Sequence, residues 1–295
     1  MAKVLITGID GFTGSHLSRY LRGKGLSVQG TSFFRNDPHN EAYKCDIRHV
    51  GEVRKIIAQT VPDYIIHLAG IAFVASENTE EMYSVNIQGS LNVLNACLDL
   101  KIFPNKIILA SSASVYGNIM STVLSEEMCP LPNSHYANSK LAMENMARTY
   151  FDKLKILIVR PFNYIGPGQA QHFVIPKIVE HYRLKKEEIE LGNTHVFREF
   201  NDIRYVMALY FKALSCDNVS DIVNFCSGNA ISLIEAIEIL TMLTNHKIKI
   251  NVNPEFVRKN EILSLTGSVE KLERMLGPPS KIIPLTDTLS RMLND

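Results

Sequence analysis

Short runs of apolar, mostly β-branched residues alternate with longer segments of helical periodicity through the first half of the chain. The strands expected from these runs lie near 3–7, 26–32, 63–67, 106–110 and 154–160. Strands that alternate with helices are typical of a parallel sheet. The runs at 65–69 and 106–110 are continuously apolar, as expected for strands that helices cover on both faces. The pattern therefore predicts a doubly wound α/β fold.

The rhythm changes after Arg160-Pro161-Phe162-Asn163, where a glycine and proline loop at 166–168 precedes a longer helical pattern. Helices are expected near 173–184, 203–215, 231–244 and 268–276. We therefore expect a main domain at 1–162 and a smaller C-terminal lobe at 163–295. The strand-like run at 221–225 indicates that a segment near 194–226 rejoins the main domain.

The composition is that of an ordinary globular protein, with 46% apolar residues, 21% charged residues and a net charge of +1. This balance lacks the positive charge of a nucleic-acid-binding protein. The five cysteines form no Cys-x-x-Cys pair and the histidines show no metal-ligand spacing, so we expect free thiols, no metal and a cytoplasmic location. The apolar run at residues 1–7 is too short for a signal peptide or a membrane span.

A glycine-rich turn joins the first strand to a helical segment. Its candidate cofactor-binding residues are Gly8, Asp10, Gly11, Phe12, Thr13 and Gly14. Glycines let the backbone approach a pyrophosphate, and a helix N-terminus offers N–H groups to it. A tight turn that needs glycine only for its backbone angles is the alternative. The position on the first strand of an alternating α/β chain favours a dinucleotide.

The end of the second strand bears on the choice of cofactor. NAD sites usually carry an acid there, which accepts a hydrogen bond from the ribose. The stretch at 28–35 has no carboxylate, whereas Ser32 and Arg35 could bind a 2′-phosphate. This favours NADP(H), with NAD(H) as the alternative if Arg35 only caps a loop.

Tyr136 and Lys140 lie four residues apart and therefore share one face of a predicted helix. A nearby ammonium favours a phenolate, so the pair could exchange a proton with a substrate oxygen, although this spacing also arises by chance. Further candidates fall at or just beyond strand ends: Gly8, Ser32, His67, Ser112 and Asn163. Doubly wound sheets bind ligands at this edge, so one active site is predicted there.

Four motifs occur in order along the chain: Thr7-Gly8-x-x-Gly11-Phe12-x-Gly14, Ser111-Ser112-Ala113-Ser114-Val115-Tyr116-Gly117, Tyr136-x-x-Ser139-Lys140 and Arg160-Pro161-Phe162-Asn163. With them the chain resembles the extended short-chain dehydrogenase/reductases over nearly its full length. Two stretches, at 166–169 and 257–277, resemble the branch that contains GDP-mannose 4,6-dehydratases and GDP-6-deoxy-4-keto-mannose reductases. The resemblance implies a Rossmann dinucleotide-binding domain followed by a nucleotide-sugar-binding lobe.

The resemblance also implies roles for individual residues. Tyr136 would be the catalytic acid/base, Lys140 its electrostatic partner, and Ser112 the hydroxyl that binds the reacting oxygen. Implied cofactor contacts are Tyr136, Lys140, Asp46, Ile47, Leu68, Ala69 and Gly70. Implied contacts to a nucleotide-diphosphate sugar are Ser112, Ser114, Asn163, Arg198 and Arg258. Of these, the two arginines suit the diphosphate, because paired guanidiniums can each form a bidentate bond to phosphate oxygens.

The chain departs from the 4,6-dehydratases directly after Ser112. Elimination of water needs a base and an acid, which those enzymes carry at the positions of Ala113 and Ser114. Glu126 and Glu127 lie in a predicted surface loop and are interpreted as structural. The sequence therefore favours reduction of the 4-keto group of a nucleotide-linked 4-keto-6-deoxyhexose, GDP-linked according to the tail.

Two other readings stay open. A nucleotide-sugar 4-epimerase would use the same serine, tyrosine and lysine, and a non-catalytic cofactor-binding protein would use only the fold. In the resembling family, helices corresponding to those expected near 80–101 and 135–152 commonly form a dimer interface. A homodimer is therefore expected.

Overall fold

A computed structural model describes residues 1–34, 42–72, 78–119, 121–216, 220–257, 263–278 and 281–295. The chain divides into two compact units. The first comprises residues 1–117, 129–161 and 207–223, and the second comprises residues 118–128, 162–206 and 224–295.

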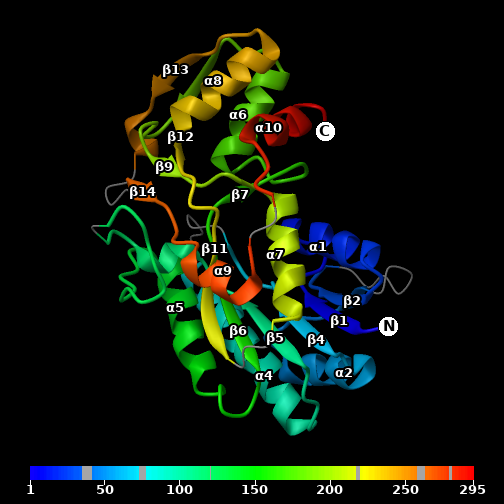
Figure 1. Cartoon of the computed structure of the whole chain (residues 1–295). Helices are drawn as coiled ribbons and strands as arrows, with labels where there is room; N and C mark the ends of the chain where they lie inside the picture. The colour runs from blue at the N-terminus through cyan, green and yellow to red at the C-terminus, as the bar shows by residue number, and fades with distance from the viewer. Residues whose placement is uncertain (35–41, 73–77, 120, 217–219, 258–262, 279–280) are drawn as a thin grey trace. The chain divides into compact units, whose positions relative to one another are not determined.

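A seven-stranded sheet in the order β11-β6-β5-β4-β1-β2-β3 forms the centre of the first unit (Figure 1). Its strands are β1 (Lys3–Thr7), β2 (Ser27–Ser32), β3 (Ala42–Lys44), β4 (Tyr64–His67), β5 (Lys106–Ala110), β6 (Ile156–Pro161) and β11 (Asp221–Phe225). The neighbours from β6 to β3 pair in parallel. The predicted doubly wound parallel sheet is thus confirmed, with β3 as an additional short strand.

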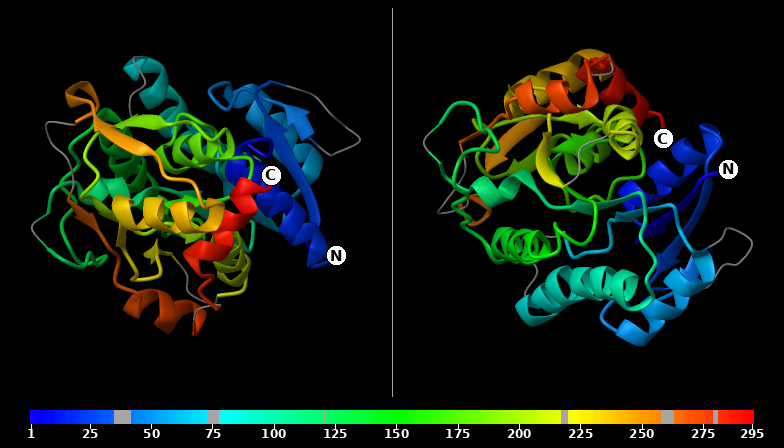
Figure 2. Two further views of the ribbon diagram at one scale, coloured as in Figure 1. Left: turned by 90° about the horizontal axis from the view of Figure 1, so that it is seen from above. Right: turned by 60° about the horizontal axis from the view of Figure 1, so that its bottom comes forward.

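Helices cover both faces of this sheet. The helical segments of the unit are α1 (Phe12–Gly23), α2 (Val50–Thr60), α3 (Thr79–Tyr83), the π-helix η2 (Ser84–Gln88), α4 (Gly89–Asp99), the 3₁₀-helix η3 (Ala113–Tyr116) and α5 (His135–Arg148). Helix α7 (Ile203–Leu214) belongs to this unit from residue 207 onward. Figure 2 shows α2 and α4, coloured blue to teal, side by side. On the other face, Tyr20 of α1 contacts Phe211 of α7 with ring centroids 6.2 Å apart.

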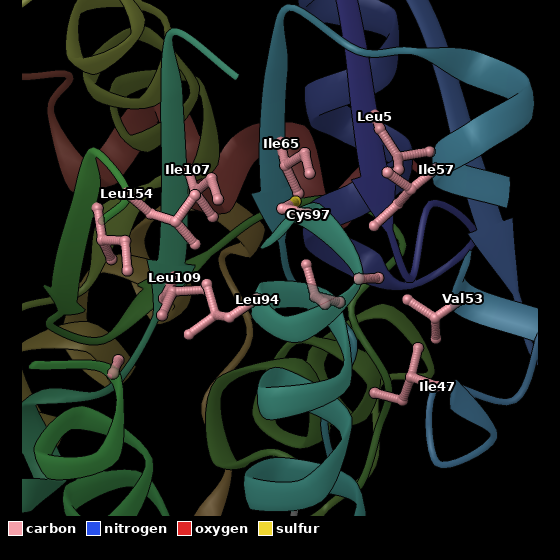
Figure 3. Packing of buried hydrophobic residues seen from close by; sticks show 14 of the residues in the cluster. Leu5, Ile47, Val53, Ile57, Ile65, Leu94, Cys97, Ile107, Leu109 and Leu154 are labelled. Atoms are coloured by element: carbon pink, nitrogen blue, oxygen red, sulfur yellow. The ribbon is translucent and has the colours of Figure 1, made fainter. Parts of the chain in front are cut away.

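The main core lies between the sheet and the helices α2, α4 and α5. Leu5, Ile65 and Ile107 point from three neighbouring strands toward Ile57 of α2 and Leu94 of α4 (Figure 3). Because β4 and β5 are buried on both faces, their side chains need no polar alternation. This explains the continuously apolar runs in the sequence.

The second unit has a separate core and small sheets. Its strands are β7 (Tyr164–Ile165), β8 (Glu188–Leu191), β9 (Phe197–Arg198), β10 (Asn201–Asp202), β12 (Ile231–Ser232), β13 (Lys249–Val252) and β14 (Ser264–Leu265). Its helices are α6 (Val174–Arg183), α8 (Leu233–Thr244), the 3₁₀-helix η4 (Pro254–Phe256), α9 (Glu270–Leu276) and α10 (Leu285–Leu293). The apolar faces of α6, α8 and α10 pack together in this core.

Candidate active site

The turn between β1 and α1 has the geometry of a phosphate-binding loop. Gly8 has φ +71°, and a Cβ on Gly14 would lie 2.2 Å from the carbonyl oxygen of Gly8, so packing alone requires both glycines. Gly11 differs, because its Cβ would meet only that same oxygen at 3.3 Å. Gly11 is also the exposed N-cap of α1, with no side-chain cap. Its bare backbone leaves room for an anion at the helix N-terminus, so this turn fits a dinucleotide pyrophosphate.

The segment after β4 passes directly beneath this turn. Leu68 N donates to Thr7 O at 3.2 Å, and Ala69 N donates to Thr7 Oγ1 at the same distance. A Cβ on Gly70 would lie 3.2 Å from Lys140 Nζ. The predicted cofactor-binding glycines and the predicted catalytic lysine are therefore brought together within one unit.

Lys140 is a buried cation on α5. Its Nζ donates to Ala110 O at 2.9 Å, at the end of β5, and its side chain is 7% exposed. Burial lowers the pKa of Lys140 to about 8, although the charge of Glu144 opposes the shift. Tyr136 lies one turn earlier on the same helix and is also buried. The predicted pair thus shares a helix, and the charge of the lysine changes near neutral pH.

Ser112 caps the 3₁₀-helix η3, directly after β5. Its Oγ accepts from Ser114 N at 3.1 Å and donates to Ser114 Oγ at 3.1 Å. Ala113 between them is buried. This segment therefore presents hydroxyl groups and no carboxylate, which leaves it without a proton acceptor for elimination at neutral pH.

Glu126, the nearest alternative acid in the sequence, is used structurally in the second unit. Its Oε1 accepts from Asn224 N at 2.6 Å. The neighbouring Glu127 is exposed. Both observations agree with the structural interpretation of these acids.

Asn86 was missed by sequence reasoning, although it links two parts of the site. From the π-helix η2, its Oδ1 accepts from Ile71 N at 2.9 Å and its Nδ2 donates to Ser139 Oγ at 2.9 Å. These bonds fix the segment after Gly70 against helix α5. Asn86 has no exposed surface although it is polar. It also lies in a π-helical turn, and such turns are frequent at functional sites.

A buried ion pair supports the other side of α5. Arg160 of β6 donates through Nε to Glu144 Oε1 at 2.9 Å and through Nη2 to Glu144 Oε2 at 2.6 Å. Ser111 Oγ also donates to Glu144, and Arg160 Nη1 donates to the Tyr116 hydroxyl at 3.0 Å. The network joins the sheet, α5 and the segment that carries Ser112. Glu144, one helical turn after Lys140, also went unnoticed in the sequence.

His67, a candidate site residue at a strand end, is buried inside the unit. Its Nδ1 lies 2.7 Å from Thr7 Oγ1 and its Nε2 lies 2.9 Å from Ser90 Oγ. Burial, with a smaller contribution from Lys140, lowers the pKa of His67 to about 3. The imidazole is therefore neutral and links β1, β4 and α4.

The predicted residues on the adenosine side are already engaged. The Asp46 carboxylate pairs with Arg48 Nη2 at 2.6 Å, and this hydrogen bonding lowers the pKa of Asp46. Ile47 is buried under Gly89, whose Cβ would lie 2.5 Å from it. Ser32 Oγ donates to Asp10 Oδ2 at 2.6 Å. Arg35 lies outside the described residues.

The second unit holds the other predicted substrate residues. Asn163 is exposed just after β6, and its carbonyl oxygen accepts from Asn201 N at 3.0 Å. Arg198 lies in β9, between β12 and β14, and its Nη1 donates to Phe197 O at 2.8 Å. Arg258 lies outside the described residues.

Glu199, beside Arg198, anchors this strand. It is completely buried, and it accepts from Ser227 N at 2.6 Å and from Gly267 N at 2.7 Å. These two bonds hold three separate segments of the unit together. Its buried carboxylate fixes the backbone that carries Arg198, a role that the sequence pattern does not reveal.

The described residues offer neither a metal-binding cluster nor a membrane-spanning helix. Within the described ranges, no group of three or more His, Cys, Asp or Glu side chains could hold a metal ion. In the same part of the chain, every helix is too short or too polar to cross a membrane.

The fold and the glycine turn define a Rossmann-type protein of the extended short-chain dehydrogenase/reductase class. The chain belongs to the NAD dependent epimerase/dehydratase family, whose model matches residues 4–226. The resemblance inferred from the motifs is thereby confirmed.

Two relatives and one solved structure show which members of this family the chain is similar to. The chain is similar to GDP-6-deoxy-D-talose 4-dehydrogenase of Aggregatibacter actinomycetemcomitans, with 31% identity over 98% of this chain and 96% of the relative. It is also similar to GDP-6-deoxy-D-mannose reductase of Pseudomonas aeruginosa, with 30% identity over 99% and 96% of the two chains. Among solved structures, RMD from Pseudomonas aeruginosa complexed with NADPH has a TM-score of 0.86 and 28% identity, covering 100% of this chain and 97% of the other. These names indicate carbonyl–alcohol chemistry on nucleotide sugars.

Proposed function

We propose that the protein reduces the 4-keto group of a nucleotide-linked 4-keto-6-deoxyhexose, with GDP as the nucleotide. The observation that carries this proposal is the arrangement after β5, where Ser112 is followed by Ala113 and Ser114. A hydroxyl without adjacent acids suits hydride transfer and does not suit elimination of water. The two relatives, one a GDP-sugar 4-dehydrogenase and one a GDP-sugar reductase, support the same assignment.

The protein residues supply proton transfer and charge stabilisation. A bound nicotinamide cofactor supplies the hydride for the keto carbon. The Tyr136 hydroxyl donates a proton to the oxygen that becomes the alcohol. The Ser112 hydroxyl donates a hydrogen bond to the same oxygen and stabilises its developing negative charge. The buried Lys140 ammonium stabilises the tyrosinate left behind.

Arg198 and Asn163 are assigned to the nucleotide sugar, with Arg258 as the second half of a diphosphate clamp. Glu199 supports this role for Arg198, because it fixes the backbone of β9. A guanidinium so positioned can form a bidentate bond to phosphate oxygens. Guanine rests on the relatives and on the resemblance of the tail.

A 4-epimerase is the second candidate, favoured by the description of the matched family. An epimerase oxidises and then reduces the same sugar carbon, so its cofactor returns to the starting state after each turnover. A reductase consumes one reduced cofactor for each product molecule. Stoichiometry therefore separates the two functions.

The proposal also includes a nicotinamide cofactor and a homodimer. NADP(H) was expected from Ser32 and Arg35, and a similar structure holds NADPH. The hydrogen bond from Ser32 to Asp10 bears on that choice, because it holds a carboxylate at the same strand end. A cytoplasmic homodimer remains part of the proposal, supported by five free cysteines and by the family expectation. Light scattering that finds a monomer at working concentration would remove the dimer.

The function is tested with purified protein, a GDP-linked 4-keto-6-deoxyhexose and reduced cofactor. We expect consumption of one reduced cofactor for each 6-deoxyhexose formed. A product epimerised at C4 without net cofactor consumption would support the epimerase. No turnover across GDP-, UDP- and dTDP-linked sugars would support a non-catalytic protein.

A further inference from the structure

A carboxylate reaches the end of β2 from a neighbouring turn. Asp10 lies between the glycines of the β1–α1 turn, and its Oδ2 accepts from Ser32 Oγ at 2.6 Å. Ser32 is the last residue of β2 and is 1% exposed. An acid is thus present at the strand end, although β2 itself carries none.

The backbone fixes this carboxylate in place. Gly8 N and Ile9 N both donate to Thr31 O, at 2.9 and 3.0 Å, and so hold the turn against β2. Gly30 permits the close approach, because a Cβ there would lie 2.5 Å from Ile9 Cβ. The position of Asp10 therefore follows from the packing of the turn on the strand.

The hydroxyl of Ser32 already takes part in two hydrogen bonds. It has a single hydrogen, which it donates to Asp10, and its oxygen accepts from Phe34 N at 3.2 Å. Within the described parts of the chain, no ion pair neutralises Asp10. A phosphate bound to Ser32 would therefore displace this hydrogen bond and lie beside a second negative charge.

We propose that Asp10 selects NAD(H) over NADP(H) by accepting a hydrogen bond from the adenosine ribose and repelling a 2′-phosphate. An acid at the end of the second strand performs this task in dinucleotide-binding folds, and here the glycine turn supplies it. The inference deepens the proposed function, since it concerns the cofactor of the same site. It does not depend on the identity of the sugar.

The test measures cofactor binding without any sugar. Isothermal titration calorimetry of the full chain with NADH and NADPH should give at least about tenfold tighter binding of NADH, the scale of one hydrogen bond to a charged group. Asp10→Asn should reduce that preference about tenfold. Asp99→Asn removes an exposed acid that pairs with Arg54, and should leave the preference unchanged.

The variant Ser32→Ala tests whether the end of β2 binds a 2′-phosphate through Ser32. If Ser32 binds a 2′-phosphate, Ser32→Ala will weaken NADPH selectively. On our proposal this variant keeps the preference for NADH, because the Asp10 carboxylate remains. Tighter binding of NADPH by the wild type, or an unchanged preference in a folded Asp10→Asn protein, would overturn the inference alone. NADH binding without sugar reduction would instead overturn the proposed function.

Discussion

The buried pair of Glu144 and Arg160 offers a quantitative test of how the site is supported. Both side chains are almost completely buried, and two hydrogen bonds of 2.9 and 2.6 Å join them. Burial alone would lower the pKa of Arg160, but hydrogen bonding and the charge of Glu144 raise it above its ordinary value. If Glu144 is removed, the guanidinium still stays charged, because the ordinary pKa of arginine lies far above neutral pH.

Glu144→Gln keeps an oxygen for Ser111 but leaves the guanidinium without a counter-charge. Breaking one side of a buried ion pair typically costs about 3–5 kcal/mol. We expect a loss of that size in the free energy of unfolding, measured by urea denaturation. The variant should also lower the pKa of Lys140 below about 8, because the charge of Glu144 raises it in the native protein.

The double variant Glu144→Gln, Arg160→Met separates stability from electrostatics. It removes both charges, and replacement of a whole buried ion pair by uncharged residues often changes the free energy of unfolding very little. We expect it to recover most of the lost stability while the alkaline limb of its pH–rate profile stays displaced to lower pH. The single variant Arg160→Met completes the cycle. If its loss of stability and that of Glu144→Gln simply add in the double variant, the two side chains are not coupled as an ion pair. An unshifted alkaline limb would refute its action on Lys140.

Four further predictions concern the residues of the site. Tyr136→Phe keeps the ring and removes the proton donor, so turnover should fall about 10²–10⁴-fold with little change in cofactor binding, and near-wild-type turnover would exclude the assignment. The kcat/KM of the wild type should fall as pH rises through about 8, where Lys140 loses its proton, and a profile flat through that region would contradict the role. Because the folded pKa lies below the ordinary 10.5, Lys140 also makes stability rise with pH between about 8 and 10.5. Gly14→Ala should destabilise the protein by about 1–3 kcal/mol and weaken cofactor binding, whereas Gly23→Ala in the same helix, with nothing within 4 Å of its Cβ, should not.

The sequence predicted the sheet because its strands are buried on both faces and are therefore continuously apolar. β3 escaped prediction, since three residues are too few to show a pattern. Helix α10 was also missed, although it packs on α6 and α8 in the second core. Its sequence is amphipathic, so the helix could have been predicted, whereas the helices on which it packs depend on the tertiary structure.

The candidate site was predictable where its residues follow strand ends. Ser112 follows β5, and Lys140 Nζ donates to Ala110 O at the end of the same strand. The contributions of Glu144 and Asp10 depend on contacts between segments distant in the sequence. Asp10 is the clearest case, because its effect on the end of β2 comes from a neighbouring turn and not from the strand itself.

Carbonyl reduction on a nucleotide sugar is tested by following the cofactor and the sugar in the same reaction. GDP- and dTDP-linked 4-keto-6-deoxyhexoses are offered with NADH or NADPH, the absorbance of the reduced cofactor is followed, and the product sugar is identified. We predict loss of one reduced cofactor for each 6-deoxyhexose formed, fastest with the GDP-linked sugar. Conversion of the sugar with no net loss of reduced cofactor would contradict the account.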